Sequence, residues 1–284
     1  MILMDLSQIF FSNLHVALSK PDFKDQSDKE FENIIRHMIL NSIRSYRSKL
    51  LEEWGEIVVC VDSKDNWRDR EFSHYKERRK IKRESSSTDW DKIFGMFNII
   101  KGELETIFPY RFIEVPGAEA DDIIGTIVHE FNTKIDKIFI LSGDSDFKNL
   151  LKYPNVKLYS PVKKEFLEEK EPEYALFEKI VTGDSGDGIP NILSDDDVFV
   201  TDGKRQKPIR KTKVRKWFEN GIPEEHREKF NRNRTLIDLS LTPEILKNDI
   251  IYNCRKQHNK NRDNILDYLK ENELNNLIDK IKDF

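Results

Sequence analysis

Residues 137–147 read KIFILSGDSDF, and this stretch decides the class of fold. It starts with a short apolar run, which two carboxylates, Asp144 and Asp146, follow closely. A short apolar run bounded by a turn is typical of a buried strand. The apolar side chains at residues 147–151 then have the spacing of a short helix. A strand that passes directly into a helix is the repeating unit of an α/β protein.

The same unit occurs elsewhere in the first 160 residues. Short apolar runs end at Asp5 and Asp62, and further strands are expected at residues 112–115 and 156–159. The expected helices cover residues 31–53, 88–108, with Thr88 and Asp91 as an N-cap pair, and 119–131. This alternation predicts an α/β fold with a mostly parallel central sheet flanked by helices. Strand signals fade after about residue 172, so we expect two domains, residues 1–185 and a smaller helical one at residues 186–284.

Acidic side chains gather where the expected strands end. Because ligands of open α/β sheets bind beyond the carboxyl ends of the strands, five separate places on the chain should bring nine carboxylates to one edge. They are Asp5, Asp62, Glu119, Asp121, Asp122, Asp144, Asp146, Asp184 and Asp187. Converging carboxylates repel one another unless divalent cations neutralise them. The histidines are scattered and the two cysteines have no zinc-site spacing, so the pattern favours Mg²⁺ or Mn²⁺ over zinc.

Each acidic position also has an ordinary explanation. A single aspartate after a strand is usually a turn former or a helix N-cap. Acids in the first turn of the helix at residues 119–122 complement the helix dipole. The segment Gly183–Gly188 could be an acidic surface loop. The metal-site hypothesis therefore depends on all five places meeting in one sheet.

The charge of the chain is segregated rather than large. The chain has 284 residues, of which 37% are hydrophobic, enough for a core beneath a heavily charged surface, and its net charge is −4. Residues 64–83 carry nine Lys and Arg against four acids, and residues 204–216 carry eight and no acid. Such tracts can hold phosphates while the acids hold metals. Cysteine usage fits a reducing, intracellular setting, and no stretch approaches the roughly 20 apolar residues of a membrane span.

The first basic tract follows the strand that ends at Asp62, so it should stand over the acidic site. Its cations could hold phosphates and its aromatic side chains, Phe72 and Tyr75, could stack on bases. The alternative for both tracts is a solvated basic surface. The expected nucleic-acid contacts are Arg68, Arg70, Tyr75, Lys76, Arg78, Arg79, Lys80, Lys204, Arg205, Lys207, Arg210, Lys211, Lys213 and Arg215.

Five motifs together resemble one family. They are Asp5–Leu6–Ser7–Gln8–Ile9, Val61–Asp62, Glu119–Ala120–Asp121–Asp122, Ser142–Gly143–Asp144–Ser145–Asp146–Phe147 and Gly183–Asp184–Ser185–Gly186–Asp187. Their order and intervals over residues 1–190 resemble those of the 5′-nuclease superfamily, which includes flap endonucleases, the 5′-nuclease domains of bacterial DNA polymerases and bacteriophage 5′-exonucleases. Within it the chain resembles the T-even-type bacteriophage RNase H enzymes in particular.

The resemblance implies two metal sites beneath a basic arch at residues 64–87. The first site would be formed by Asp5, Asp62, Glu119, Asp121 and Asp144, and the second by Asp122, Asp146, Asp184 and Asp187. Lys76 and Arg79 of the arch would steer the scissile phosphate, so that Lys76, Arg79 and Asp144 are the expected catalytic residues. One departure is that Gly188–Ile189–Pro190 does not lead into the Gly-rich helix–hairpin–helix of cellular members. The duplex contact could pass instead to residues 204–216.

The expected function is that of a 5′-3′ nuclease with flap endonuclease and ribonuclease H activity, which removes RNA primers and 5′ flaps during DNA replication. It would use two Mg²⁺ ions, with Mn²⁺ as a substitute, and act as a monomer on branched DNA and RNA–DNA hybrids in the cytoplasm of a bacterial host. A single-strand-binding protein or a sliding clamp is a candidate partner, and no membrane is involved. Two alternatives stay open: a non-catalytic DNA-binding protein of nuclease ancestry and a haloacid-dehalogenase-type phosphatase.

Overall fold

The computed structural model describes residues 1–20, 27–256 and 261–284, and it is built on one six-stranded sheet. The strand order is β3-β2-β1-β4-β5-β6, and every neighbouring pair is parallel except β5 with β6. The strands are β1 (Ile2–Asp5), β2 (Ile57–Val61), β3 (Arg111–Glu114), β4 (Ile138–Leu141), β5 (Val156–Ser160) and β6 (Glu165–Leu167). The expected mostly parallel sheet is therefore confirmed. The antiparallel edge strand β6 was not expected, because its three residues carry no alternating apolar pattern.

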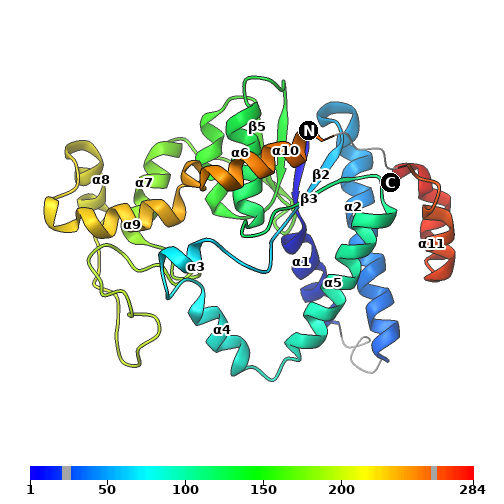
Figure 1. Cartoon of the computed structure of the whole chain (residues 1–284), viewed down its shortest axis with the longest axis horizontal. Helices are drawn as coiled ribbons and strands as arrows, with labels where there is room; N and C mark the ends of the chain where they lie inside the picture. Colours follow the sequence, from blue (N-terminus) through cyan, green and yellow to red (C-terminus); the bar gives the residue numbers. More distant parts are fainter. Residues whose placement is uncertain (21–26, 257–260) are drawn as a thin grey trace.

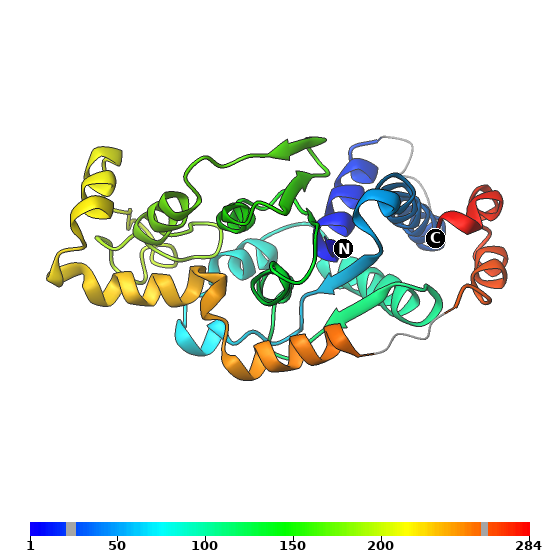
Figure 2. The same ribbon diagram turned by 90° about the horizontal axis from the view of Figure 1, so that it is seen from above.

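Successive side chains of a strand point to opposite faces of the sheet, and a separate hydrophobic core lies on each face. Ile2 and Met4 of β1 face one core, which also contains the helices α1 (Leu6–Leu18), α2 (Asp28–Trp54) and α5 (Trp90–Ile107). Leu3 faces the other core, beneath α6 (Ala120–Phe131), the 3₁₀ helix η2 (Ser145–Lys152) and α10 (Glu244–Arg255). Helices thus cover both faces of the sheet (Figures 1 and 2).

Helix starts follow local capping chemistry. Ser27 and Glu30 form a capping box at the start of α2. Helix α5 begins at Trp90, and Asp89 is its N-cap, accepting a hydrogen bond of 3.0 Å from the Lys92 amide. The sequence prediction of Thr88 with Asp91 as the cap was therefore wrong by one residue, because aspartate and threonine are comparable caps and both precede the helix.

Helices of the second half of the chain lie at both ends of the molecule. The helices α7 (Pro172–Thr182), α8 (Lys211–Asn220) and α9 (Arg227–Ile237) lie toward one end, and α11 (Ile265–Glu271) lies at the other (Figures 1 and 2). The 3₁₀ helix η3 (Glu224–His226) precedes α9, and η4 (Leu239–Leu241) packs into the second core through Leu239. Helix α11 and η5 (Asn275–Asp283) pack into the core of α1, α2 and α5 through side chains such as Leu269 and Phe284. The residues expected to form one C-terminal helical domain thus lie in three places, because η4 and α10 cover the sheet between the two ends.

The basic arch forms two short helices, α3 (Arg68–Glu71) and α4 (Glu77–Glu84), between β2 and α5. They lie on the side of the sheet where β1, β2 and β4 end (Figure 1). Within the described ranges, no helix combines the length and the hydropathy needed to cross a membrane.

Candidate active site

Five of the nine predicted carboxylates line one cleft at the carboxyl edge of the sheet. Asp5 ends β1, Asp62 follows β2, Asp144 follows β4, and Asp121 lies in the first turn of α6. The cleft has a volume of about 700 Å³, and Lys76, Arg79 and Asp187 also line it. Parallel strands order β2, β1 and β4 side by side, so their ends place these acids together although they are far apart in the sequence.

Backbone amides and hydroxyl groups orient the acids. Asp5 accepts a hydrogen bond of 3.0 Å from the Gln8 amide as the N-cap of α1. Asp62 accepts from Ser7 Oγ at 2.6 Å and from the Ala120 amide at 2.8 Å. Gln8 Oε1 in turn accepts from the Gly143 amide and so fixes the loop that carries the aspartate after β4.

Burial and mutual repulsion raise the pKa of three of the cleft acids. Burial raises the pKa of Asp5 to about 7, and the neighbouring charges of Asp62 and Asp144 add to the shift. Burial, followed by the charges of Asp144 and Asp5, raises the pKa of Asp121 well above its usual range. Burial also raises the pKa of Asp144, although Lys179 opposes it. A divalent cation would remove this repulsion, so the donor set fits one.

The carboxylates lie too far apart in this structure to share one metal ion as ligands. Over the three described ranges, no three acidic, histidine or cysteine side chains converge closely enough to hold one metal ion. Cationic side chains lie between them instead. The ammonium of Lys76 contacts Glu119 Oε1 and lies 4.0 Å from Asp187 Oδ2, and the guanidinium of Arg79 contacts Asp187 Oδ1.

The arch is joined to the acidic loop at residues 183–188. The Lys76 amide donates to the Asp187 carbonyl at 2.8 Å, and Arg79 Nε donates to the Gly186 carbonyl at 2.8 Å. Gly188 has φ +75°, and a Cβ there would lie 2.7 Å from the His74 carbonyl oxygen, so only glycine allows this approach. Lys76 itself has φ 53°, in the left-handed region that non-glycine residues rarely adopt. The backbone thus directs Lys76 toward the acids.

The structure corrects two predicted roles, because Arg68 and Asp122 are buried against each other. Arg68 is 3% exposed and Asp122 is 0% exposed. The guanidinium donates to both oxygens of Asp122, at 2.8 and 2.9 Å, to Glu119 at 3.1 Å and to the Leu236 carbonyl at 2.8 Å. Trp67 and Thr242 also donate to Asp122. Arg68 is therefore not placed to contact nucleic acid, and Asp122 is not placed to hold a metal.

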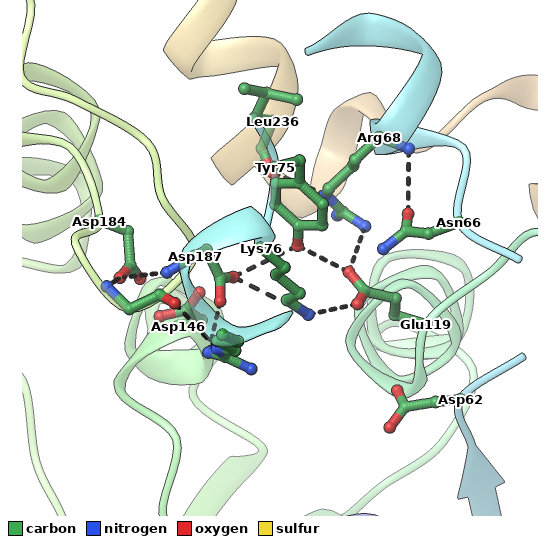
Figure 3. A network of polar contacts seen from close by, with 12 residues as sticks. Asp62, Asn66, Arg68, Tyr75, Lys76, Glu119, Asp146, Asp184, Asp187 and Leu236 are labelled. Atoms are coloured by element: carbon green, nitrogen blue, oxygen red, sulfur yellow. Dashed lines mark hydrogen bonds and ion pairs between the residues drawn. The ribbon is translucent and has the colours of Figure 1, made fainter. Parts of the chain in front are cut away.

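Glu119 and Tyr75 belong to the same buried network. Burial alone would raise the pKa of Glu119, but the charges of Lys76 and Arg68 lower it to about 2. Tyr75 Oη donates to Glu119 at 2.8 Å and to Asp187 at 3.2 Å (Figure 3). The Tyr75 ring is buried, as is that of Phe72, so neither can stack on a base as the sequence suggested.

One functional candidate was missed by the sequence analysis. Lys179 of α7 contacts Asp146 Oδ1 and lies 2.8 Å from Asp184 Oδ2. These acids line a second cavity of about 560 Å³, next to the first cleft, together with Lys148, Asn149 and Lys211. No sequence pattern indicated a functional role for Lys179, because a lysine in the last turn of a helix is expected from the helix dipole alone.

The remaining predicted phosphate contacts lie on two exposed surfaces. Arg70, Arg79 and Lys80 are exposed on the arch, and Arg78 is half-buried with its guanidinium 5.6 Å from the Phe199 ring centroid. On and before α8, the exposed cations are Lys204, Arg205, Lys207, Arg210, Lys211 and Lys213. Two members of the tract are paired, Lys204 with Asp197 at 2.6 Å and Arg215 with Glu171 at 2.6 Å. Residues 204–216 contain no acid, but acids from other segments of the chain pair with two of their cations.

Two family models match the chain. The model of the 5′-3′ exonuclease N-terminal resolvase-like domain matches residues 1–184, and the model of the T4 RNase H C-terminal domain matches residues 170–284. The chain is 31% identical over 292 residues to the ribonuclease H of Enterobacteria phage T4, with 97% of this chain and 94% of that protein covered. It is 28% identical over 162 residues to a 5′-3′ exonuclease of Buchnera aphidicola, with 54% and 51% covered.

Solved structures agree in fold. The T5 5′-exonuclease with bound zinc has a TM-score of 0.62 at 18% identity, with 97% of this chain and 98% of that chain covered. A T5 flap endonuclease in a pseudo-enzyme-product complex with DNA and metal ions has a TM-score of 0.64 at 17% identity, with 99% and 98% covered.

Proposed function

We propose, from the premise that this chain belongs to the 5′-3′ exonuclease family, that it is a divalent-metal-dependent 5′-3′ nuclease. It hydrolyses phosphodiester bonds in 5′ flaps and in RNA–DNA hybrids and so removes RNA primers during replication. Its relatives support this function, since they include a ribonuclease H, a 5′-3′ exonuclease and a flap endonuclease in complex with DNA.

The single observation that carries the proposal is the cleft with an acidic floor and a cationic rim. Asp5, Asp62, Asp121 and Asp144 line it together with Lys76 and Arg79 of the arch. An acidic floor alone would repel a phosphate. A floor that holds cations, combined with a basic rim, attracts a phosphodiester and stabilises the extra charge of its transition state.

The acids divide into two groups that would hold two ions, for which we propose Mg²⁺, with Mn²⁺ as a substitute. Asp5, Asp62, Asp121 and Asp144 would hold the first, and Asp146, Asp184 and Asp187 the second. When bound, such ions lower the pKa of a coordinated water and offset charge on the phosphate. Asp5 and Asp62 are held in place by the Gln8 and Ala120 amides. Lys76 and Arg79, released from Glu119 and Asp187, would orient the scissile phosphate.

Nucleic acid would contact both exposed basic surfaces. The arch would lie over the strand that enters the cleft, and the cations at residues 204–213 would contact duplex phosphates in place of a Gly-rich helix–hairpin–helix. Residues 1–185 would thus perform the chemistry and residues 186–241 would hold the duplex. We further propose that the protein acts as a monomer in the cytoplasm of the host cell, as its phage relative suggests, with a single-strand-binding protein or a sliding clamp as a candidate partner.

The two alternative functions are not favoured. A haloacid-dehalogenase-type phosphatase would not account for the basic arch, and the family models that match are nuclease models. A non-catalytic DNA-binding protein would have no need of an acidic floor whose carboxylates repel one another.

Cleavage of a 5′-labelled flap duplex and of an RNA–DNA hybrid tests the proposal. The wild type should release short 5′ products only when Mg²⁺ is added, and Asp144→Asn should not. Asp267→Asn, an exposed aspartate on the distant α11, is the matched control and should cleave like the wild type. Flap binding that is equal with and without Mg²⁺, with no cleavage, would support the DNA-binding protein instead.

A further inference from the structure

Lys179 holds two of the acids that the proposed function assigns to the second ion. Its ammonium contacts Asp146 Oδ1 and lies 2.8 Å from Asp184 Oδ2. The two aspartates come from different elements, Asp146 from the first turn of η2 and Asp184 from the loop directly after α7. The Lys179 side chain is 21% exposed, so the ion pairs are only partly screened by solvent.

The two groups of acids differ in their ion pairs. Among the described residues, no Lys or Arg side chain forms an ion pair with Asp5, Asp62, Asp121 or Asp144. In the second group, Lys179 pairs with Asp146 and Asp184, and Arg79 pairs with Asp187.

Space for a different position of Lys179 exists beside it. The cavity of about 560 Å³ that Lys179 lines contains Lys148 and Lys211 on its walls, together with Asn149. Asn149 Oδ1 is buried and has no hydrogen-bond partner among the described residues. It is an acceptor that the cavity offers to a donor such as an ammonium.

We propose, resting on the proposed metal-dependent function, that Lys179 is a built-in cation that occupies the second acidic pair and must leave it before a divalent ion binds there. In the metal-free protein it keeps Asp146 and Asp184 from repelling each other. Its displacement into the neighbouring cavity places three ammonium groups, those of Lys148, Lys179 and Lys211, where a phosphate of the duplex can bind. Binding of the second ion and of duplex are then mutually reinforcing, because each favours the same position of Lys179.

Calorimetric titration of the full chain with Mn²⁺ alone tests this inference without any cleavage. Lys179→Met removes the competing charge while keeping the length of the side chain. The weaker of two Mn²⁺ sites should then bind about tenfold more tightly, which corresponds to the loss of one partly screened ion-pair competitor. The tighter site should be unchanged. Lys157→Met is the control, since Lys157 is exposed near the start of β5, at the edge of the sheet opposite the acids, and its Mn²⁺ affinities should equal those of the wild type.

Each outcome decides a different question. Unchanged or weaker Mn²⁺ binding by folded Lys179→Met overturns the inference, because the lysine would then only support the fold or orient the acids. A wild type that binds no Mn²⁺ refutes the proposed metal-dependent function itself. If Lys179→Met does not fold, NMR of the lysine side chains in the wild type gives the answer. The Lys179 signal, assigned from Lys179→Arg, should shift on addition of Mg²⁺ while the signal of the distant Lys157 does not. A Lys179 signal that stays in place overturns the inference.

Discussion

Replacing Arg68 with methionine removes the cation that lies between two buried carboxylates. Arg68 is 3% exposed and donates three hydrogen bonds to Asp122 and Glu119. Methionine fills much of the volume of arginine but leaves both carboxylates without this partner. Breaking a buried ion pair on one side costs about 3–5 kcal/mol of unfolding free energy.

The remaining contacts place the expected loss at the lower end of that range. Asp122 keeps hydrogen bonds from Trp67, Thr242 and the Glu119 amide, and Glu119 keeps Lys76 and Tyr75. We therefore expect Arg68→Met to lower the unfolding free energy by about 3 kcal/mol. Adding Asp122→Asn should recover part of this loss, because the second substitution removes the charge that the first left unpaired.

Urea unfolding followed by circular dichroism measures these values, and flap-DNA binding in EDTA is measured in parallel. Arg70→Met is the matched control, since Arg70 is exposed on the same short helix. It should change the unfolding free energy by less than about 0.5 kcal/mol and should weaken flap binding. A loss below about 1 kcal/mol in Arg68→Met, together with weaker flap binding, would refute the reasoning and return Arg68 to the nucleic-acid surface.

Three further predictions concern the cleft and the basic surfaces. Lys76→Met should lower the cleavage rate about 10²–10³-fold, whereas the Kd for flap DNA should change by less than about threefold. The reason is that Lys76 faces the reacting phosphate rather than the duplex. An equal loss of affinity for flap DNA would contradict this assignment. The pKa of Asp5 is about 7 in the folded, metal-free protein, against a usual value of 3.8. Between these two values the folded protein keeps a proton that the unfolded chain loses. The melting temperature of the metal-free protein should therefore fall as the pH rises from 5 to 7. The fall should disappear with saturating Mg²⁺, and a pH-independent melting temperature without metal would show that Asp5 is ionised throughout. The double variant Lys211→Met/Lys213→Met should reduce the slope of log Kd against log salt for flap DNA by about 2, whereas the distant Lys282→Met should leave it unchanged.

Much of the site was predictable because it depends on local sequence and on a general property of parallel sheets. The apolar runs before Asp5, Asp62 and Asp144 define three strands, and parallel strands end at the same edge. The structure adds that β2, β1 and β4 are neighbours in the sheet, which brings the three acids close together. The acidic helix start at residues 119–122 was also predictable, but not which of its acids faces the cleft.

Asp121 and Asp122 are neighbours in the first turn of α6, but their side chains lie in different surroundings. Asp121 lines the cleft, whereas Asp122, about 100° further around the helix, is sealed beneath Arg68, Trp67 and Thr242. The contacts that bury it come from the arch and from the segment before α10, which lie 54 and 120 residues away in the sequence. Arg68 was assigned to nucleic acid because its neighbours are exposed cations, and the sequence does not distinguish a buried arginine from an exposed one.

The sequence by itself therefore determined the α/β class, the family and the carboxylates that follow three of the strands, because these depend on local periodicity and on the order of motifs along the chain. Only the tertiary structure decided which charges meet. It paired Lys179 with Asp146 and Asp184, buried Arg68 with Asp122, and returned residues 265–284 to the core of α1, α2 and α5. The physical reason is that the packing of segments far apart in the sequence decides which charged side chains pair. The local sequence around a charged residue does not show which distant segment packs against it.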